Sequence, residues 1–169
     1  MPGTGAAIAI RPAVTTDVPE IRRMVIELAV YEKEPPERVR LCEADLYRDA
    51  FGTPPACEIL IAERNDGRLL GFTLFCRNYS TWEGRAGIHI EDLYVREEAR
   101  AAGLGRRLLS AVAGIAATRG CPRVDLNVLH WNPAKRFYER AGLYELDQWQ
   151  QYRLEGAALM ALAAEAVEP

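Results

Sequence analysis

The sequence predicts a single α/β domain in which a mixed, mostly antiparallel sheet carries helices on both faces, and three observations lead to this prediction. Short stretches rich in β-branched and aromatic residues alternate with segments whose apolar residues recur every three or four positions. Asn65-Asp66-Gly67 separates two of the strand-like stretches, and an Asp-Gly pair supplies the positive φ of a β-hairpin turn. The chain has 169 residues and no repeat or low-complexity tract, which suits one domain.

The amino-terminal half predicts a strand, two helices and a hairpin. Asp17 and Glu20 form a capping-box pattern at the start of the first helix, which should end before Pro35. In chain order we expect a strand at 7–13, the first helix from about 17, a second helix at 42–51, and hairpin strands at 58–64 and 69–77.

The carboxy-terminal half alternates strands and helices. A polar, aromatic loop at 79–87 should lead into a strand at 88–95, and the next helix opens at Gly103 and Gly105 and closes at Gly120. The remaining expected elements are a strand at 123–129, a short helix at 132–142 capped by Gly142, one or two strands at 143–154, and an Ala-rich helix at about 156–167.

Composition argues against several classes of function. A formal net charge of −3 does not suit a nucleic-acid surface, and no stretch forms a leader peptide or reaches membrane-spanning length. The four cysteines are scattered without a C-x-x-C pair, so we expect reduced thiols in a cytoplasmic protein. His89 and His130 have no partner at ligand spacing, so we expect no metal site.

The stretch Arg100–Arg106 combines two arginines, two glycines and a helix start. Glycines at such a place expose backbone N–H groups where the helix dipole is positive, an arrangement that binds anionic oxygens. A Walker loop would end in Gly-Lys-Ser/Thr, where Arg106-Arg107 stand, and a dinucleotide fingerprint would have a third glycine in place of Leu108. Arg-x-x-Gly-x-Gly after a strand is the pattern that remains.

This pattern resembles the pyrophosphate-binding loop of the GNAT acetyltransferases. Five further segments, "IRPA", "ELAVYEKE", "NYSTWEGR", "IEDLYV" and "WNPAKRFYERAGL", together resemble the diamine acetyltransferases, which act on spermidine, spermine or thialysine. The resemblance runs from about residue 8 to residue 154 and implies one GNAT domain over 1–169. It also implies acetyl-CoA as the donor, a small cationic amine as the acceptor, and a homodimer. Relatives commonly have one more residue between the Asn and the Phe-Tyr of the last segment, and often a glycine at the position of Ala101.

The resemblance implies where the donor binds. Backbone N–H groups of Leu93, Tyr94 and Val95, at a bulge in the strand, would polarise the thioester carbonyl and bind the pantetheine amides. Asn132 and Tyr138 would face the pantetheine arm and the sulfur. The pyrophosphate would be held by Arg100, Ala101, Ala102, Gly103, Leu104, Gly105 and Arg106.

Acetyl transfer to an amine needs a base for the ammonium proton and an acid for the departing thiolate. The resemblance implies Tyr138 as the acid and Glu91 as a base that acts through water, with direct transfer in a ternary complex. Glu91 and Asp92 face opposite sides of an ideal strand, with Asp92 on the side of Ile90 and Tyr94. One of the two acids should therefore point inward, where burial raises the pKa of a carboxyl group, and either could be that acid.

The acceptor site is expected to be acidic and aromatic. Glu32 resembles a family carboxylate that meets the substrate ammonium, with Glu91 and Asp92 nearby, and Tyr79 and Trp82 could line the entrance by cation–π contact. Two other interpretations stay open: a non-catalytic acyl-CoA-binding or sensing domain on the same fold, and a protein or peptide N-acetyltransferase.

Overall fold

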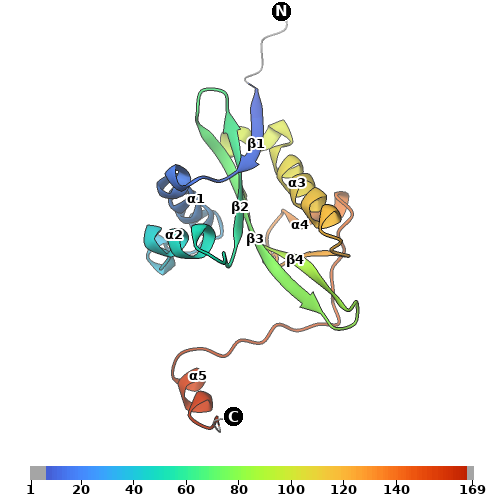
Figure 1. Ribbon diagram of the computed structural model, residues 1–169. Coiled ribbons are helices and arrows are strands. Elements are labelled where there is room, and N and C mark those ends of the chain that lie inside the picture. Colours follow the sequence, from blue (N-terminus) through green and yellow to red (C-terminus); the bar gives the residue numbers. More distant parts are fainter. Residues whose placement is uncertain (1–6, 167–169) are drawn as a thin grey trace, which may run out of the picture. The chain divides into compact units, whose positions relative to one another are not determined.

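Five strands form one sheet in the computed structural model, which describes residues 7–166 and, at Ala101, the backbone only (Figure 1). The strands are β1 (Ile8–Pro12), β2 (Glu58–Arg64), β3 (Leu69–Ser80), β4 (Arg85–Val95) and β5 (Val124–Leu126). They lie side by side in chain order. The first four pair in antiparallel fashion and β5 pairs in parallel with β4, which confirms the mixed, mostly antiparallel sheet.

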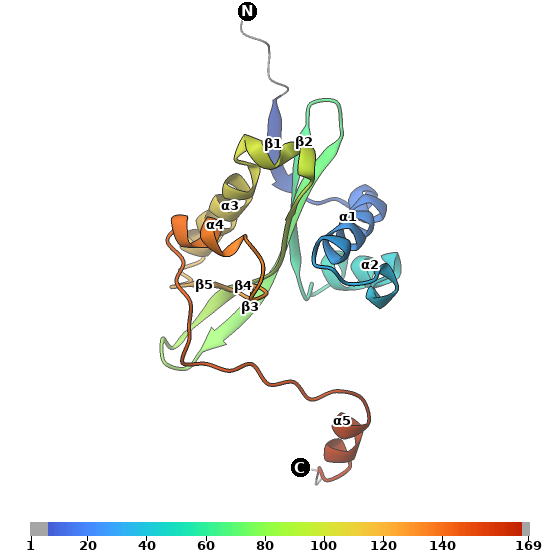
Figure 2. The same ribbon diagram turned by 180° about the vertical axis from the view of Figure 1, so that it is seen from behind.

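Helices cover both faces of this sheet. Figure 1 and Figure 2 show α1 (Val18–Tyr31) and α2 (Glu43–Phe51) on one side and α3 (Leu104–Thr118) on the other. Apolar residues of α1 recur at helical spacing and are buried, because they pack against the sheet together with Leu46 of α2. The buried residues of α3 are Leu104, Leu108, Leu109, Val112 and Ala116.

The chain divides into two compact units, of which the first ends at Asn132 and the second begins at Pro133. The sheet and helices α1 to α3 belong to the first unit. Helices α4 (Lys135–Arg140) and α5 (Gly156–Ala163) belong to the second. The single domain over 1–169, with a core at about 8–154, stays a prediction. Residue 167, the expected end of the last helix, lies outside the described residues.

The capping box expected at Asp17 and Glu20 is wrong. Asp17 does precede α1, but its carboxylate accepts hydrogen bonds from the Arg11 guanidinium at 2.6 and 3.0 Å and from the Val14 amide at 2.8 Å. Glu20 instead accepts a 2.6 Å hydrogen bond from Arg96. Asp17 therefore bonds to residues that precede the helix, and Glu20 bonds to Arg96, 76 residues away, as well as to Arg23.

Three further boundaries differ from expectation. Most of the predicted loop at 79–87 belongs to strands, because β3 and β4 pair out to Ser80 opposite Arg85. The strand expected at 123–129 is limited to β5. Among the described residues, 143–154 form no strand, although late strands were predicted there. A strand needs β-prone residues and also a neighbouring strand with which to pair. Local sequence shows the residues but not whether a partner strand lies beside them.

Two absences hold for residues 7–166. No helix there is long and apolar enough to cross a membrane. No group of three or more His, Cys, Asp or Glu side chains is placed to hold a metal ion.

Candidate active site

The open edge of β4 is the first feature of the site. Strand β5 pairs with β4 only over Ile88–Ile90, so among the described residues no strand lies against the edge of Glu91–Val95 that faces away from β3. Backbone groups along that edge are left to bind something other than a strand.

Ladder geometry shows which groups point to this edge. The Arg96 amide, directly after β4, donates a hydrogen bond of 2.9 Å to the carbonyl of Leu70 in β3. In an antiparallel pair, residues alternate between bonding to the partner strand and pointing away from it. Leu93 and Val95 therefore direct their N–H and C=O groups to the open edge. Leu93 and Val95 are two of the three residues expected to bind the pantetheine arm, whereas the backbone of Tyr94 faces β3 instead.

A β-bulge lies at Glu91, two residues before the position expected for it. Leu74 pairs with Asp92 and the next residue, Phe75, pairs with Ile90, so Glu91 has no partner in β3. Because Leu74 and Phe75 face opposite sides of the sheet, so do Asp92 and Ile90. The expectation that these two share a face is therefore wrong, and the extra residue in the strand is the reason.

The bulge turns Asp92 toward the side of the sheet that α1 covers. Leu74, its partner, packs against the core on that side, and so does Tyr94, whose hydroxyl donates to Glu27 of α1 at 3.2 Å. Burial, and then the charges of Glu91 and Glu32, raise the pKa of Asp92 from 3.8 to about 6. Asp92 is thus the inward acid of the pair.

Glu32 and Glu91 complete an acidic cluster with Asp92. Burial, and then the charge of Glu34, raise the pKa of Glu32. The Glu91 side chain is 66% exposed, with one oxygen 3.8 Å from His89 Nε2. Among residues 7–166, no lysine or arginine forms an ion pair with any of the three carboxylates. A cluster of carboxylates without its own cation suits a cationic ligand.

The end of α1 places Glu32. The Lys33 and Glu34 amides donate to the Val30 and Ala29 carbonyls at 3.1 and 2.9 Å, which is the Schellman arrangement of a helix end. Lys33 occupies the left-handed position with a φ of 64°. Its ammonium lies 4.1 Å from the centre of the Trp131 ring, which ties the helix end to the loop after β5.

Tyr31 is a site residue that the sequence analysis did not single out. Its hydroxyl donates to Asn132 Oδ1 at 3.3 Å, and the Arg100 guanidinium lies 4.6 Å from its ring centre. The segment "ELAVYEKE" contains Tyr31, directly before Glu32, and that adjacency was the available signal.

The glycine turn has the geometry of an anion site. A 3-10 turn (Glu97–Ala102) runs into Gly103, whose φ of 68° is left-handed, and α3 starts at Leu104. The first-turn amides of a helix have no acceptor within it, so those at the start of α3 point out of its N-terminus. A Cβ added at Gly103 would meet no atom within 4 Å, so there is open space beside the turn. Outward-pointing amides and open space beside them are two features that an anion site needs.

Tyr79 and Trp82 lie away from the acidic cluster. Tyr79 pairs with Ala86 near the end of the β3–β4 hairpin, and Trp82 lies in its turn with 86% of the side chain exposed. Tyr79 is five residues along β3 from Leu74, the partner of Asp92, which corresponds to about 17 Å of extended strand. Within one chain, the structure does not bring these aromatics to the carboxylates.

Tyr138 lies in the second compact unit, on α4. Its ring meets that of Phe137 edge-on, with 4.9 Å between the centres. Its carbonyl accepts from the Leu143 amide at 3.1 Å, and Gly142, with a φ of 99°, provides the predicted helix cap. The role of Tyr138 as an acid rests on the resemblance.

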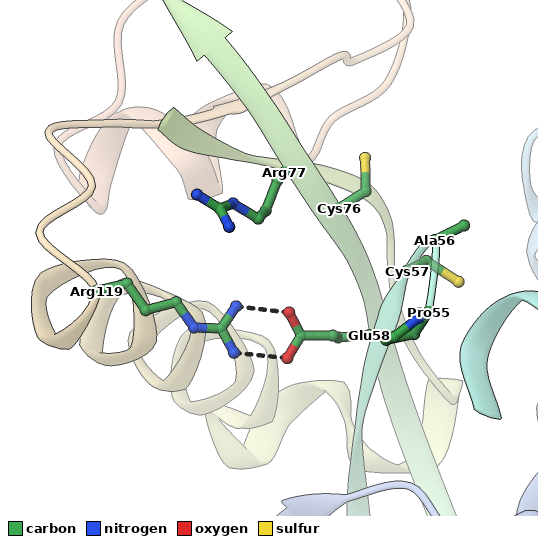
Figure 3. Close-up of a pocket in the computed structure, with 7 residues that line it drawn as sticks. All are labelled: Pro55, Ala56, Cys57, Glu58, Cys76, Arg77 and Arg119. Carbon is green, nitrogen blue, oxygen red and sulfur yellow. Dashed lines mark hydrogen bonds and ion pairs between the residues drawn. The ribbon is translucent and has the colours of Figure 1, made fainter. Parts of the chain in front are cut away.

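A pocket of about 410 Å³ opens elsewhere in the first unit. Figure 3 shows it beside Glu58, which accepts hydrogen bonds of 2.5 and 2.6 Å from Arg119 at the end of α3. Its other lining residues are Pro55, Ala56, Cys57, Cys76 and Arg77. It contains none of the predicted site residues, and its one carboxylate is already paired with an arginine.

Comparison with known proteins identifies the family. The model of the Acetyltransferase (GNAT) family matches residues 24–143. The chain belongs to the GNAT acetyltransferase family. As a GNAT protein it is an N-acetyltransferase, from a family that uses acyl-CoA donors.

Among GNAT proteins, the chain is related to the diamine and thialysine acetyltransferases, as the resemblance implied. It is 37% identical to a thialysine N-epsilon-acetyltransferase of Sus scrofa, over 94% of this chain and 98% of the relative. It is 34% identical to the spermidine/spermine N(1)-acetyltransferase-like protein 1 of Homo sapiens, over 92% of this chain and 24% of that longer protein. Among solved structures, an integron cassette protein from V. cholerae matches with a TM-score of 0.76 and 26% identity, over 94% of this chain and 99% of the other.

Proposed function

We propose that this protein transfers the acetyl group of acetyl-CoA to a primary amine of a small cationic acceptor, either a diamine or polyamine or a thialysine-like amino acid. The observation that carries the proposal is the cluster of Glu32, Glu91 and Asp92 beside the open edge of β4. The thialysine and spermidine/spermine relatives support the choice of acceptor. A homodimer working in the cytoplasm is also proposed, from the resemblance and from the scattered cysteines.

The donor would lie along the open edge. The N–H groups of Leu93 and Val95 would bind the pantetheine amides and the thioester carbonyl. The first-turn amides of α3 and Gly103 would bind the pyrophosphate, and Arg106 would add its positive charge. Bound acetyl-CoA supplies an activated acyl group. Asn132 would border the pantetheine arm, as its family position implies.

The acceptor would approach from the acidic cluster. Glu32 and Glu91 would attract the ammonium groups, and Asp92 would hold the water that takes the proton from the attacking nitrogen. This assigns to Asp92 the role that the resemblance implied for Glu91, because Asp92 is the inward, half-buried acid with the raised pKa. Tyr138 would then donate its hydroxyl proton to the thiolate as the carbon–sulfur bond breaks.

A free-thiol assay tests the proposal. With acetyl-CoA we expect coenzyme A release with diamines, polyamines or thialysine, and kcat/KM should rise as the pH increases through about 6 because Asp92 must be ionised. Asp92→Asn should lower kcat about a hundredfold or more and remove this pH limb, whereas Glu91→Gln should keep it.

Two results would contradict the proposal. If no amine in the panel released thiol while acetyl-CoA still bound, the chain would be a non-catalytic acyl-CoA-binding domain. If only peptides with an accessible amine were acetylated, the acceptor would be a protein.

A further inference from the structure

Arg100 makes contacts that a purely phosphate-binding residue would not need. Its Nε donates to the Val95 carbonyl at 2.9 Å, on the open edge of β4. Its guanidinium lies 4.6 Å from the centre of the Tyr31 ring and 5.9 Å from that of Tyr94. The side chain thus reaches back from the turn to the end of the strand and to α1.

Tyr31 continues this connection toward the acceptor side. The Arg100 guanidinium lies over the Tyr31 ring, and the Tyr31 hydroxyl donates a hydrogen bond to Asn132 in the loop after β5. The residue after Tyr31 is Glu32. The side chains of Arg100 and Tyr31 therefore connect four segments. These are the glycine turn, the open edge of β4, the loop after β5 and the end of α1. All four lie in the first compact unit.

We propose that Arg100 and Tyr31 form a positioning pair that sets the distance between the donor edge at Leu93 and Val95 and the acceptor carboxylate Glu32. The inference rests on the proposed function and adds to it a role for two residues that touch neither reacting group. Arg100 acts by fixing the Val95 carbonyl and the end of α1 together, rather than by binding the pyrophosphate, as the sequence pattern suggested.

Placement of this kind has a large effect on rate. The amine must meet the thioester carbon at about 3 to 3.5 Å, and an error of about 1 Å can lower the rate a hundredfold. The pair is suited to prevent such an error, because a planar guanidinium stacked on a ring and bonded to a carbonyl has little freedom to move.

Two donors distinguish positioning from phosphate binding. Acetyl-CoA carries the pyrophosphate, and S-acetylpantetheine has the same thioester without it. Arg100→Met should lower kcat about tenfold to a hundredfold with both donors. The matched control Arg106→Met should mainly raise KM for acetyl-CoA, and its penalty should be at least tenfold smaller with S-acetylpantetheine.

A double-mutant cycle shows whether the two residues act as one. Tyr31→Leu removes the ring and should lower kcat as Arg100→Met does, and the double variant should be little worse than either single one. Tyr31→Phe keeps the ring under Arg100, so it should restore kcat to within a few-fold of wild type. Thermal unfolding of each variant separates a loss of fold from a loss of placement.

Three outcomes would overturn the pair. They are an Arg100→Met penalty that disappears with S-acetylpantetheine, additive effects of the two substitutions, or an unchanged kcat in both single variants. Each is read against an active wild type, whereas wild-type protein that acetylates no amine would contradict the proposed function instead.

Discussion

The surroundings of Asp92 raise the pKa of its carboxyl group at the expense of stability. The bulge at Glu91 turns the carboxyl group toward the covered face of the sheet, where burial and two neighbouring carboxylates oppose its ionisation. The same effects that raise its pKa leave it ionised only above about pH 6. A charged group in such a place destabilises the fold at neutral pH.

The pH dependence of unfolding should reveal this cost. The pKa of Asp92 is about 6 in the folded state, and its ordinary value is 3.8. Between pH 3.8 and about pH 6, the folded state therefore keeps a proton that the unfolded state has lost. Its contribution to the free energy of unfolding therefore falls as the pH rises from about 4 to 6. Asp92→Asn should stabilise the protein by about 2 to 3 kcal/mol at pH 7.5 and by much less near pH 4, measured by urea unfolding.

A control accompanies this measurement. Glu91 is mostly exposed, so Glu91→Gln should change the free energy of unfolding by no more than about 0.5 kcal/mol at either pH. Equal stability of Asp92→Asn and wild type at pH 7.5 would mean that the carboxyl is well solvated.

At the scale of elements, α3 offers a matched pair of glycines. Gly103 precedes the helix with a φ of 68° and Gly120 follows it with a φ of 66°, and a Cβ at either would meet no atom within 4 Å. Alanine at each position should therefore cost about 1 to 2 kcal/mol for the same conformational reason. Only Gly103→Ala should also raise KM for acetyl-CoA, because only that turn adjoins the proposed pyrophosphate site.

Thermal unfolding and initial rates check this pair. An equal rise in KM for both variants would show that the loss of stability, and not the turn, affects donor binding.

The second element-scale feature is the ion network that joins α1 to β4. Arg96, with its side chain 11% exposed, donates to Glu27 at 2.7 and 3.0 Å, to Glu20 at 2.6 Å and to the Leu69 carbonyl at 2.8 Å. Hydrogen bonds from Arg96 are the main reason that the pKa of Glu27 lies below its ordinary value. Arg96 thereby secures α1, the helix directly before Glu32, against the strand that carries Asp92.

Removal of Arg96 should destabilise the fold strongly. Arg96→Met leaves the partly buried Glu27 without its ion-pair partner and leaves Glu20 with Arg23 alone, and we expect a loss of about 3 to 5 kcal/mol in the free energy of unfolding near pH 7. Arg23→Met is the control, because Arg23 pairs with Glu20 from a largely exposed position, and it should cost less than about 1 kcal/mol. Similar losses in the two variants would contradict a structural role for the network.

At the scale of the whole molecule, acidity favours cationic acceptors. The formal net charge is −3, and the three carboxylates add a local negative field beside the donor edge. Screening of exposed charges grows with ionic strength, since the Debye length falls from about 10 Å at 0.1 M salt to about 3 Å at 1 M. The acceptor should therefore bind less well in high salt, and this loss of affinity should be larger for acceptors that carry more positive charges.

Initial rates with two amines test this field. Between 0.05 and 0.5 M salt (roughly one decade), KM should rise several-fold more for a diamine than for a monoamine of similar length. If KM rises equally for the diamine and the monoamine, only one ammonium group meets the acidic cluster.

The sequence by itself determined the family and most of the elements, but not the late strands, which are absent at 143–154. Residues 88–95, the glycine pair before α3 and the Asp-Gly hairpin are local signals, because strand alternation, helix periodicity and turn chemistry depend on neighbours in the chain. The segments that resemble the diamine acetyltransferases likewise lie in short, contiguous motifs. The assignment of Tyr138, Asn132 and the homodimer rests on that resemblance alone.

Only the tertiary structure decided which acid faces inward and which residues Arg100 and Tyr31 contact. One extra residue in β4 reverses the side that Asp92 faces, and a bulge depends on the partner strand. The contact of Arg96 with Glu20 joins residues 76 positions apart, and that of Arg100 with Tyr31 joins residues 69 positions apart. Such contacts form only when packed helices and strands bring distant side chains together, so no periodicity within a single segment encodes them.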